Sequence, residues 1–210
     1  MAALSGLVFA DDHLLVADKP SGLLSVPGRG PDKQDCLSAR VQAVHPDALI
    51  VHRLDMATSG LFLMARGDAM QRALSIAFAG REVSKRYIAV VAGHLEGEGE
   101  IDLPLIADWP NRPRQKVDLA IGKPSRTAWR ALAHDAAADT TRLELEPITG
   151  RSHQLRVHLQ AIGHPILGDA LYAPPAVHDR APRLMLHAAR LEFAHPATGE
   201  MLRFESSAPF

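Results

Sequence analysis

Short runs in which apolar and polar residues alternate recur along the chain and predict half-exposed β-strands. The clearest run is Arg142-Leu143-Glu144-Leu145-Glu146, in which every second side chain is apolar. A period of two is typical of antiparallel strands that have one face on a core and the other in water. The runs that we expect to form strands are 7–10, 13–17, 61–65, 87–92, 141–146, 184–193 and 201–204.

Three other segments have the apolar spacing of a helix. Apolar side chains recur at intervals of three or four residues in 37–44, 70–78 and 155–162. Asp68 and Ser152 stand where the second and third of these helices need an N-cap residue. Because strands and helices do not alternate regularly, we expect an α+β fold with a mixed, largely antiparallel sheet flanked by helices.

The length and the cysteine content limit the class of protein. With 210 residues, of which 47% are hydrophobic, the chain is able to bury a sizeable core, and we expect one domain over 1–210. Cys36 is the only cysteine, which excludes an internal disulfide and favours a reducing compartment, the cytoplasm. The first residues contain no basic region followed by a long apolar stretch, so no secretion signal or membrane span is expected.

Positive charge is concentrated in one segment of an otherwise near-neutral chain. The formal net charge is -1, yet residues 109–130 carry six cations against one acid, together with both tryptophans, Trp109 and Trp129. The cations are Arg112, Arg114, Lys116, Lys123, Arg126 and Arg130. A solvated hairpin and an RNA-facing surface explain this segment equally well at this point.

Several common catalytic signatures do not occur in the sequence. There is no G-x-x-x-x-G-K-[ST] phosphate loop, no G-x-S-x-G elbow and no H-E-x-x-H zinc helix. His153 and His158 are five residues apart, a spacing that turns two side chains away from each other on a helix. Cys36 has no activating neighbours in the sequence, and we expect an inert thiol. We therefore expect neither a metal nor a cofactor.

An acidic residue lies in a polar loop between two predicted strands, in His52-Arg53-Leu54-Asp55-Met56-Ala57-Thr58-Ser59-Gly60. A loop on a rigid scaffold is where proteins usually present reactive groups, which makes Asp55 a candidate. The alternative is that Asp55 only accepts hydrogen bonds from the backbone of its own turn, as aspartate often does. By residue type alone, the second explanation is favoured.

A second polar cluster follows the predicted strand at 141–146. It reads Thr149-Gly150-Arg151-Ser152-His153-Gln154, and Arg151 stands at the turn that leads into the third predicted helix. An arginine in this place is able to hold a carboxylate through a two-pronged ion pair. The alternative is a surface arginine that merely completes the start of the helix.

Together with other short motifs, these clusters resemble the RluA family of RNA pseudouridine synthases. Any one of the motifs could be chance, but the ordered set is highly specific. The matching segments are Lys19-Pro20-Ser21-Gly22, His52-Arg53-Leu54-Asp55, Thr58-Ser59-Gly60, Lys85-Arg86-Tyr87, the run from Thr149 to Arg156, and Gly163-His164-Pro165-Ile166-Leu167-Gly168-Asp169. Segments 11–13, 23–29 and 108–113 are similar to those of family members with dual specificity for 23S ribosomal RNA and tRNA.

The resemblance implies a fold and a catalytic set. The family's catalytic domain is built on a bisected, largely antiparallel sheet with the active-site cleft across it, which agrees with the α+β fold expected from the pattern. Asp55 would be the catalytic nucleophile, with Arg151 paired to it. Tyr87 would pack on the target uracil and assist removal of the proton from C5, and Arg53 would enter the RNA helix where the target base has left.

The resemblance also implies an RNA partner and no cofactor. The residues expected to contact RNA are Arg53, His52, Lys85, Arg86, Arg112, Arg114, Lys116 and Arg156, and those expected to line the uracil pocket are Leu155 and Thr58. Only 18 residues precede Lys19, so we expect no N-terminal S4 domain. We expect a cytoplasmic monomer that modifies stem-loops in both 23S rRNA and tRNA.

The reaction suits a sequence that offers no redox or metal site. Uridine becomes pseudouridine when the N1–C1′ bond is cut, the uracil turns while bound, and C5 joins C1′, with a carboxylate as covalent nucleophile. The base must first leave its stack, at a cost of roughly a few kcal/mol. Attack at C1′ and attack at C6 both remain open. Two alternatives remain: a non-enzymatic RNA-binding or ribosome-assembly factor on the same fold, and a hydrolase that uses His52 with Asp55.

Overall fold

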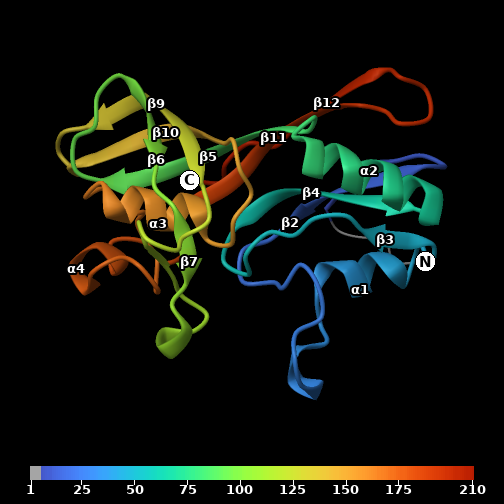
Figure 1. The fold of residues 1–210 in the computed structure, drawn as a ribbon, viewed down its shortest axis with the longest axis horizontal. Helices are drawn as coiled ribbons and strands as arrows, with labels where there is room; N and C mark the ends of the chain where they lie inside the picture. Colours follow the sequence, from blue (N-terminus) through green and yellow to red (C-terminus); the bar gives the residue numbers. More distant parts are fainter. Residues whose placement is uncertain (1–5) are drawn as a thin grey trace. The chain divides into compact units, whose positions relative to one another are not determined.

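The computed structural model describes residues 6–210, which divide into two compact units. The first unit comprises the residues up to Lys85 together with Ala188–Pro209, and the second comprises Arg86–His187 and Phe210. Figure 1 shows the helices and strands of both units. The prediction of a single domain over 1–210 stays a prediction.

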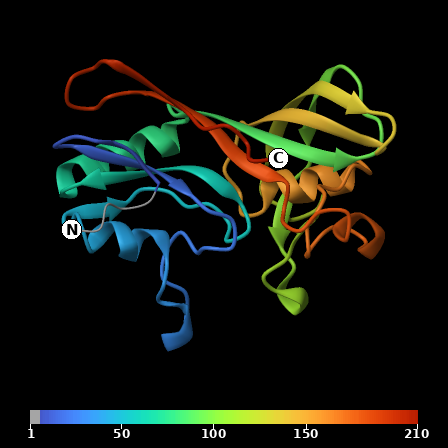
Figure 2. The ribbon, with the colours of Figure 1, turned by 180° about the vertical axis from the view of Figure 1, so that it is seen from behind.

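The first unit is built on a twisted, mainly antiparallel sheet. Its strands follow the order β1-β2-β4-β11, with β3 beside β4 and β12 beside β11. Figure 2 shows β12 folding back on β11 as a red hairpin. The bounds are β1 Leu7–Ala10, β2 Leu14–Lys19, β3 Ala48–Ile50, β4 Ser59–Arg66, β11 Leu186–Ala194 and β12 Met201–Glu205.

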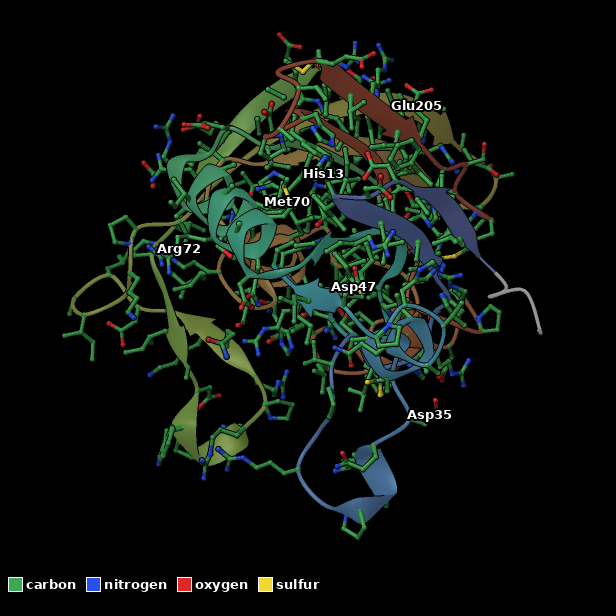
Figure 3. The ribbon with its side chains drawn as sticks, turned by 90° about the vertical axis from the view of Figure 1, so that its right-hand side faces the viewer. His13, Asp35, Asp47, Met70, Arg72 and Glu205 are labelled. Atoms are coloured by element: carbon green, nitrogen blue, oxygen red, sulfur yellow. The ribbon has the colours of Figure 1, made fainter. Side chains whose placement is uncertain are left out.

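Helix α2 (Asp68–Gly80) covers the core of this unit. Met70, labelled in Figure 3, and Leu74 are buried in one cluster with Leu61 and Leu63 of β4. Asp68 is the first helical residue and not the cap that we predicted, since Gly67 takes the cap position with φ 75°. An acid in the first turn still favours the helix through the macrodipole.

Helix α1 (Leu37–Gln42) explains the single cysteine. The Sγ atom of buried Cys36 accepts a hydrogen bond from the backbone N–H of Ala39 at 3.4 Å, so the thiol caps the helix. A 3-10 turn at Pro31–Lys33 precedes this helix. The thiol therefore has a structural role, in agreement with the expected inert cysteine.

The four sheet strands of the second unit are antiparallel to their neighbours within that unit. Its strand order is β5-β10-β9-β6, and a separate pair of strands, β7 and β8, forms a short hairpin. The bounds of these strands are β5 Ser84–Ala92, β6 Glu98–Asp102, β7 Leu105–Ala107, β8 Gln115–Val117, β9 Arg126–Asp135 and β10 Thr140–Pro147. The helical elements are 3-10 turn Trp109–Asn111, α3 Gln154–Ala161 and α4 Pro175–His178.

Helix α3 begins two residues later than the cap predicted at Ser152. Its N-cap is His153, which has φ 54° in the left-handed region. On the buried face of the helix, His158 contacts the Oγ1 atom of Thr127 and the backbone oxygen of Leu103, both at 2.9 Å. Burial lowers the pKa of His158, which is consistent with a neutral ring that links the helix to the sheet.

The α+β class predicted from the sequence is confirmed. Strands lie in each of the seven predicted runs, but the sequence pattern missed β3 and β6 to β9. In β9, exposed side chains occupy most positions beyond Thr127, so its sequence lacks regular alternation. In the described residues, no helix is long and apolar enough to cross a membrane.

Candidate active site

Asp55 lies in the loop that joins β3 to β4 in the first unit. The backbone N–H of Thr58 donates to the backbone oxygen of Asp55 at 3.1 Å and closes a turn. Leu54 is buried just before Asp55, and Gly60 follows with φ 111°. A Cβ atom at Gly60 would lie 2.3 Å from the backbone oxygen of Ala188, so only glycine fits where β4 passes β11.

The last residue of β2 and the segment after it hold the Asp55 loop through backbone carbonyl groups of the loop. The Nζ atom of Lys19, which is fully buried, donates to the oxygens of Pro20, Leu23 and Met56 at 2.9, 2.7 and 2.9 Å. The hydroxyl of Ser21 donates to the oxygen of Ala57 at 2.7 Å. A buried ammonium needs such a set of acceptors, because an unpaired buried charge is very costly.

Ser25 holds the other side of the same loop. Its hydroxyl donates to the oxygen of Leu54 at 2.7 Å and accepts from the N–H of Leu54 at 3.0 Å. Backbone groups are therefore fixed on both sides of Asp55. Sequence reasoning matched Lys19 and Ser21 to a family motif but gave them no role; the available signal was the Lys-Pro-Ser-Gly motif just after a predicted strand.

His52 contacts β4 and α2 within the first unit. Its Nε2 atom accepts the backbone N–H of Leu63 at 2.9 Å, and its ring stacks on Phe78 with centroids 4.7 Å apart. Burial, with a smaller effect of the Lys85 charge, lowers the pKa of His52 to about 3. The ring is thus neutral near pH 7 and adds no positive charge for RNA binding. The predicted RNA contact of His52 stays a prediction.

Strand β5 carries the three family residues Lys85, Arg86 and Tyr87. The Nζ atom of Lys85 lies 5.7 Å from the centroid of the Phe78 ring. Arg86 forms an ion pair with Glu146 of β10. Tyr87 is half-buried, and its backbone is in register with Leu145 of β10. The sheet of the second unit therefore fixes the backbone at Tyr87.

A buried amide organises the loop that carries Arg151. The Oε1 atom of Gln154 accepts from the hydroxyl of Thr149 at 2.7 Å and from the N–H of Arg151 at 3.0 Å. Its Nε2 atom donates to the backbone oxygen of Arg126 and to Thr127 Oγ1, at 2.8 and 3.0 Å. Sequence reasoning missed Gln154, although a glutamine at the start of an apolar helix face was a usable signal.

Arg151 itself is exposed, and its Nε atom donates to the backbone oxygen of Pro124 at 3.3 Å. Leu155 and Thr58, which we predicted to line the uracil pocket, are buried at 6% and 2% exposure. Arg53 is exposed in the Asp55 loop. The roles of these four residues stay predictions.

Arg156 does not have the surface position that an RNA contact needs. Its guanidinium forms a two-pronged ion pair with Asp169 at 2.8 and 2.6 Å, and both side chains are almost completely buried. The Oδ1 atom of Asp169 also accepts from the N–H groups of Leu171 and Tyr172. The prediction that Arg156 contacts RNA was therefore wrong: the residue ties α3 to the segment at 169–172.

The predicted cations Arg112, Arg114 and Lys116 lie on the hairpin of β7 and β8 and are exposed. The Nζ atom of Lys116 lies 3.6 Å from the Oδ2 atom of Asp118. The guanidinium groups of Arg112 and Arg114 lie over the rings of Trp109 and Tyr172. Among the described residues, no group of three or more histidine, cysteine, aspartate or glutamate side chains is arranged to hold a metal ion.

The sequence matches one protein-family model, described as RNA pseudouridylate synthase, over residues 13–161. The match covers more than half of the chain, and this chain belongs to that family of RNA-modifying enzymes. It is 52% identical to the dual-specificity RNA pseudouridine synthase RluA of Escherichia coli strain K12, over 97% of this chain and 93% of the relative. The RluA protein of Yersinia pestis is also 52% identical, over 97% and 99% of the two chains.

Solved structures agree with the sequence relatives. Human RNA pseudouridylate synthase domain containing 1 is 29% identical, with a TM-score of 0.81 over 100% of this chain and 86% of the human one. The human protein named RNA pseudouridylate synthase domain containing 4 is 25% identical. Its TM-score is 0.76 over 97% of this chain and 88% of the human one. The RluA family assignment and the enzymatic function are thus confirmed, whereas the non-enzymatic alternative finds no support.

Proposed function

We propose that this enzyme converts uridine to pseudouridine in stem-loop RNA, with Asp55 as the covalent nucleophile. The observation that carries the proposal is the fixed backbone around Asp55, where Lys19, Ser21 and Ser25 hold the carbonyl groups of Met56, Ala57 and Leu54. A nucleophile that is positioned before substrate arrives needs little further ordering in the reaction.

The proposed reaction balances without an external group. The N1–C1′ bond breaks, the uracil turns, C5 bonds to C1′, and the proton that C5 loses is replaced by one gained at N1. A bond from the carboxylate of Asp55 to the substrate divides this exchange into smaller steps. Attack at C1′ and attack at C6 both satisfy this balance.

We include Tyr87, Arg151 and Arg53 in the proposal. Tyr87 would pack on the uracil and assist loss of the C5 proton, and Arg151 would pair with the nucleophile. Arg53 would fill the space that the flipped base leaves, which offsets part of the cost of flipping. Support comes from the family motifs, together with the two-pronged geometry of guanidinium that lysine lacks.

The decisive test replaces Asp55 by asparagine. Because the amide is a poor nucleophile, we expect Asp55→Asn to form no pseudouridine, measured by mass spectrometry of digested RNA after chemical labelling, while RNA affinity stays within about threefold. The matched control is Asp35→Asn, since Asp35 is an exposed loop aspartate of the same unit, paired with Arg40 at 2.7 Å. Turnover like that of the wild type in Asp55→Asn would reject Asp55 as nucleophile.

A second test concerns Arg151. Lysine keeps the charge but not the planar fork, so we expect Arg151→Lys to lower kcat by about 100-fold and RNA affinity by less than about threefold. Single-turnover kinetics and equilibrium binding separate the two quantities. Equal losses in both would mean that Arg151 contacts RNA instead of serving the nucleophile.

We further propose that the substrates are stem-loops of both 23S rRNA and tRNA. The relatives from Escherichia coli and Yersinia pestis are described as dual-specificity enzymes. Pseudouridine mapping in cells with and without the gene, followed by reconstitution on the sites lost, tests this substrate range. Sites in only one RNA class would restrict the proposal to that class.

We also propose that the protein is a cytoplasmic monomer. The sequence has a single cysteine, Cys36, and the structure buries it. A reducing compartment that contains ribosomal RNA and tRNA suits both this thiol and the proposed substrates. Light scattering coupled to gel filtration measures the oligomeric state directly.

A further inference from the structure

The hairpin of β7 and β8 presents an aromatic ring and a guanidinium group together at its end. Trp109 is 67% exposed, and the Cζ atom of Arg112 lies 3.8 Å from the centroid of the Trp109 ring. At this distance the guanidinium lies in van der Waals contact with one face of the indole. The exposed surface of the ring therefore belongs to its edges and its other face.

The end of this hairpin, residues 108–114, is ordered by its own hydrogen bonds. The N–H of Asp108 donates to the oxygen of Arg114 at 2.9 Å, and the N–H of Arg114 donates to the oxygen of Asn111 at 3.1 Å. The side chain of Asn111 donates to Asp108 Oδ2 at 2.9 Å. Pro110 and Pro113 restrict φ further. Binding to this turn would thus require little extra ordering.

The base of the hairpin is anchored in the second unit. Leu105 packs in a buried cluster with Val157 of α3 and with Tyr172. The hydroxyl of Tyr172 accepts the N–H of Gln115 at 2.8 Å and contacts His153 Nδ1 at 2.6 Å. Figure 1 shows the segment after β7, in yellow-green, running out from this anchor to its short helical turn.

The charges near the exposed ring favour a polyanion over an apolar partner. Arg112, Arg114 and Lys116 are exposed cations on or beside the turn. The carboxylate of Asp118 accepts the N–H groups of Ala120 and Ile121, and these bonds lower its pKa, so it is engaged within its own loop. Exposed apolar side chains alone would not distinguish the two kinds of partner.

We propose that Trp109 and Arg112 form a stacking platform for one unpaired nucleobase of the stem-loop substrate. This inference rests on the proposed function and names what the hairpin recognises: a base face, in addition to phosphate charge. Sequence-specific RNA recognition usually targets unstacked bases, which stack on aromatic rings and guanidinium planes. Such a platform would distinguish a loop from a continuous duplex.

The test compares variants that remove stacking with variants that keep charge. A synthetic stem-loop RNA with one target uridine and a fully paired duplex of equal length serve as probes, each at several salt concentrations. We expect Trp109→Ala to weaken stem-loop binding about 5- to 150-fold, which corresponds to about 1–3 kcal/mol for one stacked base. Duplex affinity and the slope of log K against log salt should stay unchanged, because no phosphate contact is lost.

Matched variants sharpen the result. Trp109→Phe should recover part of the affinity, and Arg112→Lys should lose affinity while it keeps the salt slope. In a Trp129→Phe background, Trp109 is the only tryptophan, so its fluorescence should be quenched by the stem-loop and not by the duplex. Thermal unfolding checks that each variant is folded.

Two results would overturn the platform. Unchanged stem-loop affinity in Trp109→Ala would remove the exposed ring from RNA recognition, and equal losses for stem-loop and duplex would assign the hairpin to phosphate contacts alone. Pseudouridine formation by the wild-type enzyme on the same stem-loop tests the proposed function without any variant. Failure of the platform is therefore distinguishable from failure of the proposed function.

Discussion

The loops that carry Asp55 and Arg151 are both irregular, but they are held in different ways. Three side chains from residues 19–25 hold the Asp55 loop: Lys19, Ser21 and Ser25. Among these three, Lys19 is a fully buried cation. In the Arg151 loop, the neutral amide of Gln154 contacts several groups at once, and Thr149 Oγ1 also accepts the N–H of Arg126 at 2.9 Å. A cation bonded to carbonyl oxygens fixes position strongly, whereas one neutral amide leaves a loop more easily loosened.

Replacement of Lys19 should give the largest effect. Lys19→Met keeps the approximate volume but removes the ammonium donor from the carbonyl oxygens of Pro20, Leu23 and Met56, so we expect a loss of about 3–5 kcal/mol in the free energy of unfolding. The Met56 oxygen keeps the N–H of Gly22. Urea unfolding measures it, with Lys33→Met as control because Lys33 is exposed on the same unit. A loss below about 1 kcal/mol would mean that other groups hold the Asp55 loop.

Gln154 should follow with a smaller effect. Gln154→Leu removes the acceptor of Thr149 and Arg151 and the donor to Arg126, and we expect a loss of about 2–3 kcal/mol. If the amide positions Arg151, kcat should fall more than KM rises, and Gln154→Glu should not restore it, since a carboxylate would face the Arg126 oxygen. Gln160→Leu, on the exposed face of α3, is the control. A loss of stability with unchanged kcat would make Gln154 purely structural.

His52 should give the smallest effect, and its sign follows from its pKa. The unfolded ring has a pKa of 6.5 and the folded ring a pKa of about 3, so the folded state binds fewer protons between these values. The contribution of His52 is complete above pH 6.5 and is lost as the pH falls toward 3. Within any one pH unit below 6.5, the free energy of unfolding should therefore fall by up to about 1.4 kcal/mol.

The matched variant is His52→Gln, because glutamine offers an acceptor to the N–H of Leu63 but does not titrate. We expect a shallower decline below pH 6.5, measured by unfolding at several pH values. Buried His158 shifts in the same direction and keeps part of the slope. An identical slope in His52→Gln would show that the ring does not titrate on unfolding.

The sequence predicted the strands with strict alternation and the apolar faces of the helices, because these patterns depend on local spacing. It did not predict β9, whose exposed positions hide the alternation, or the burial of Arg156. Long-range pairing decided both: Arg156 reaches Asp169, thirteen residues away. An arginine in a basic motif looks identical in the sequence whether it faces RNA or a buried carboxylate.

Long-range contacts also limited what the sequence could predict about the site. The motif around Asp55 was recognisable from its residue types, but the supports Lys19 and Ser25 lie 37 and 29 positions before the groups that they hold, so no local spacing connects them. Gln154 differs, since it lies within the motif. Its role depends on a left-handed backbone at His153, which is uncommon for a residue other than glycine.

The division of the chain at residues 85 and 188 also sets an order for synthesis on the ribosome. Apart from Phe210, the second unit is made from one continuous stretch, whereas the first takes most of β11 and all of β12 from near the C-terminus. The sheet beside the nucleophile loop is therefore unfinished until almost the whole chain has emerged. A polypeptide that stops after residue 187 lacks the backbone against which Gly60 packs, so an interrupted translation product would carry Asp55 without the scaffold that presents it.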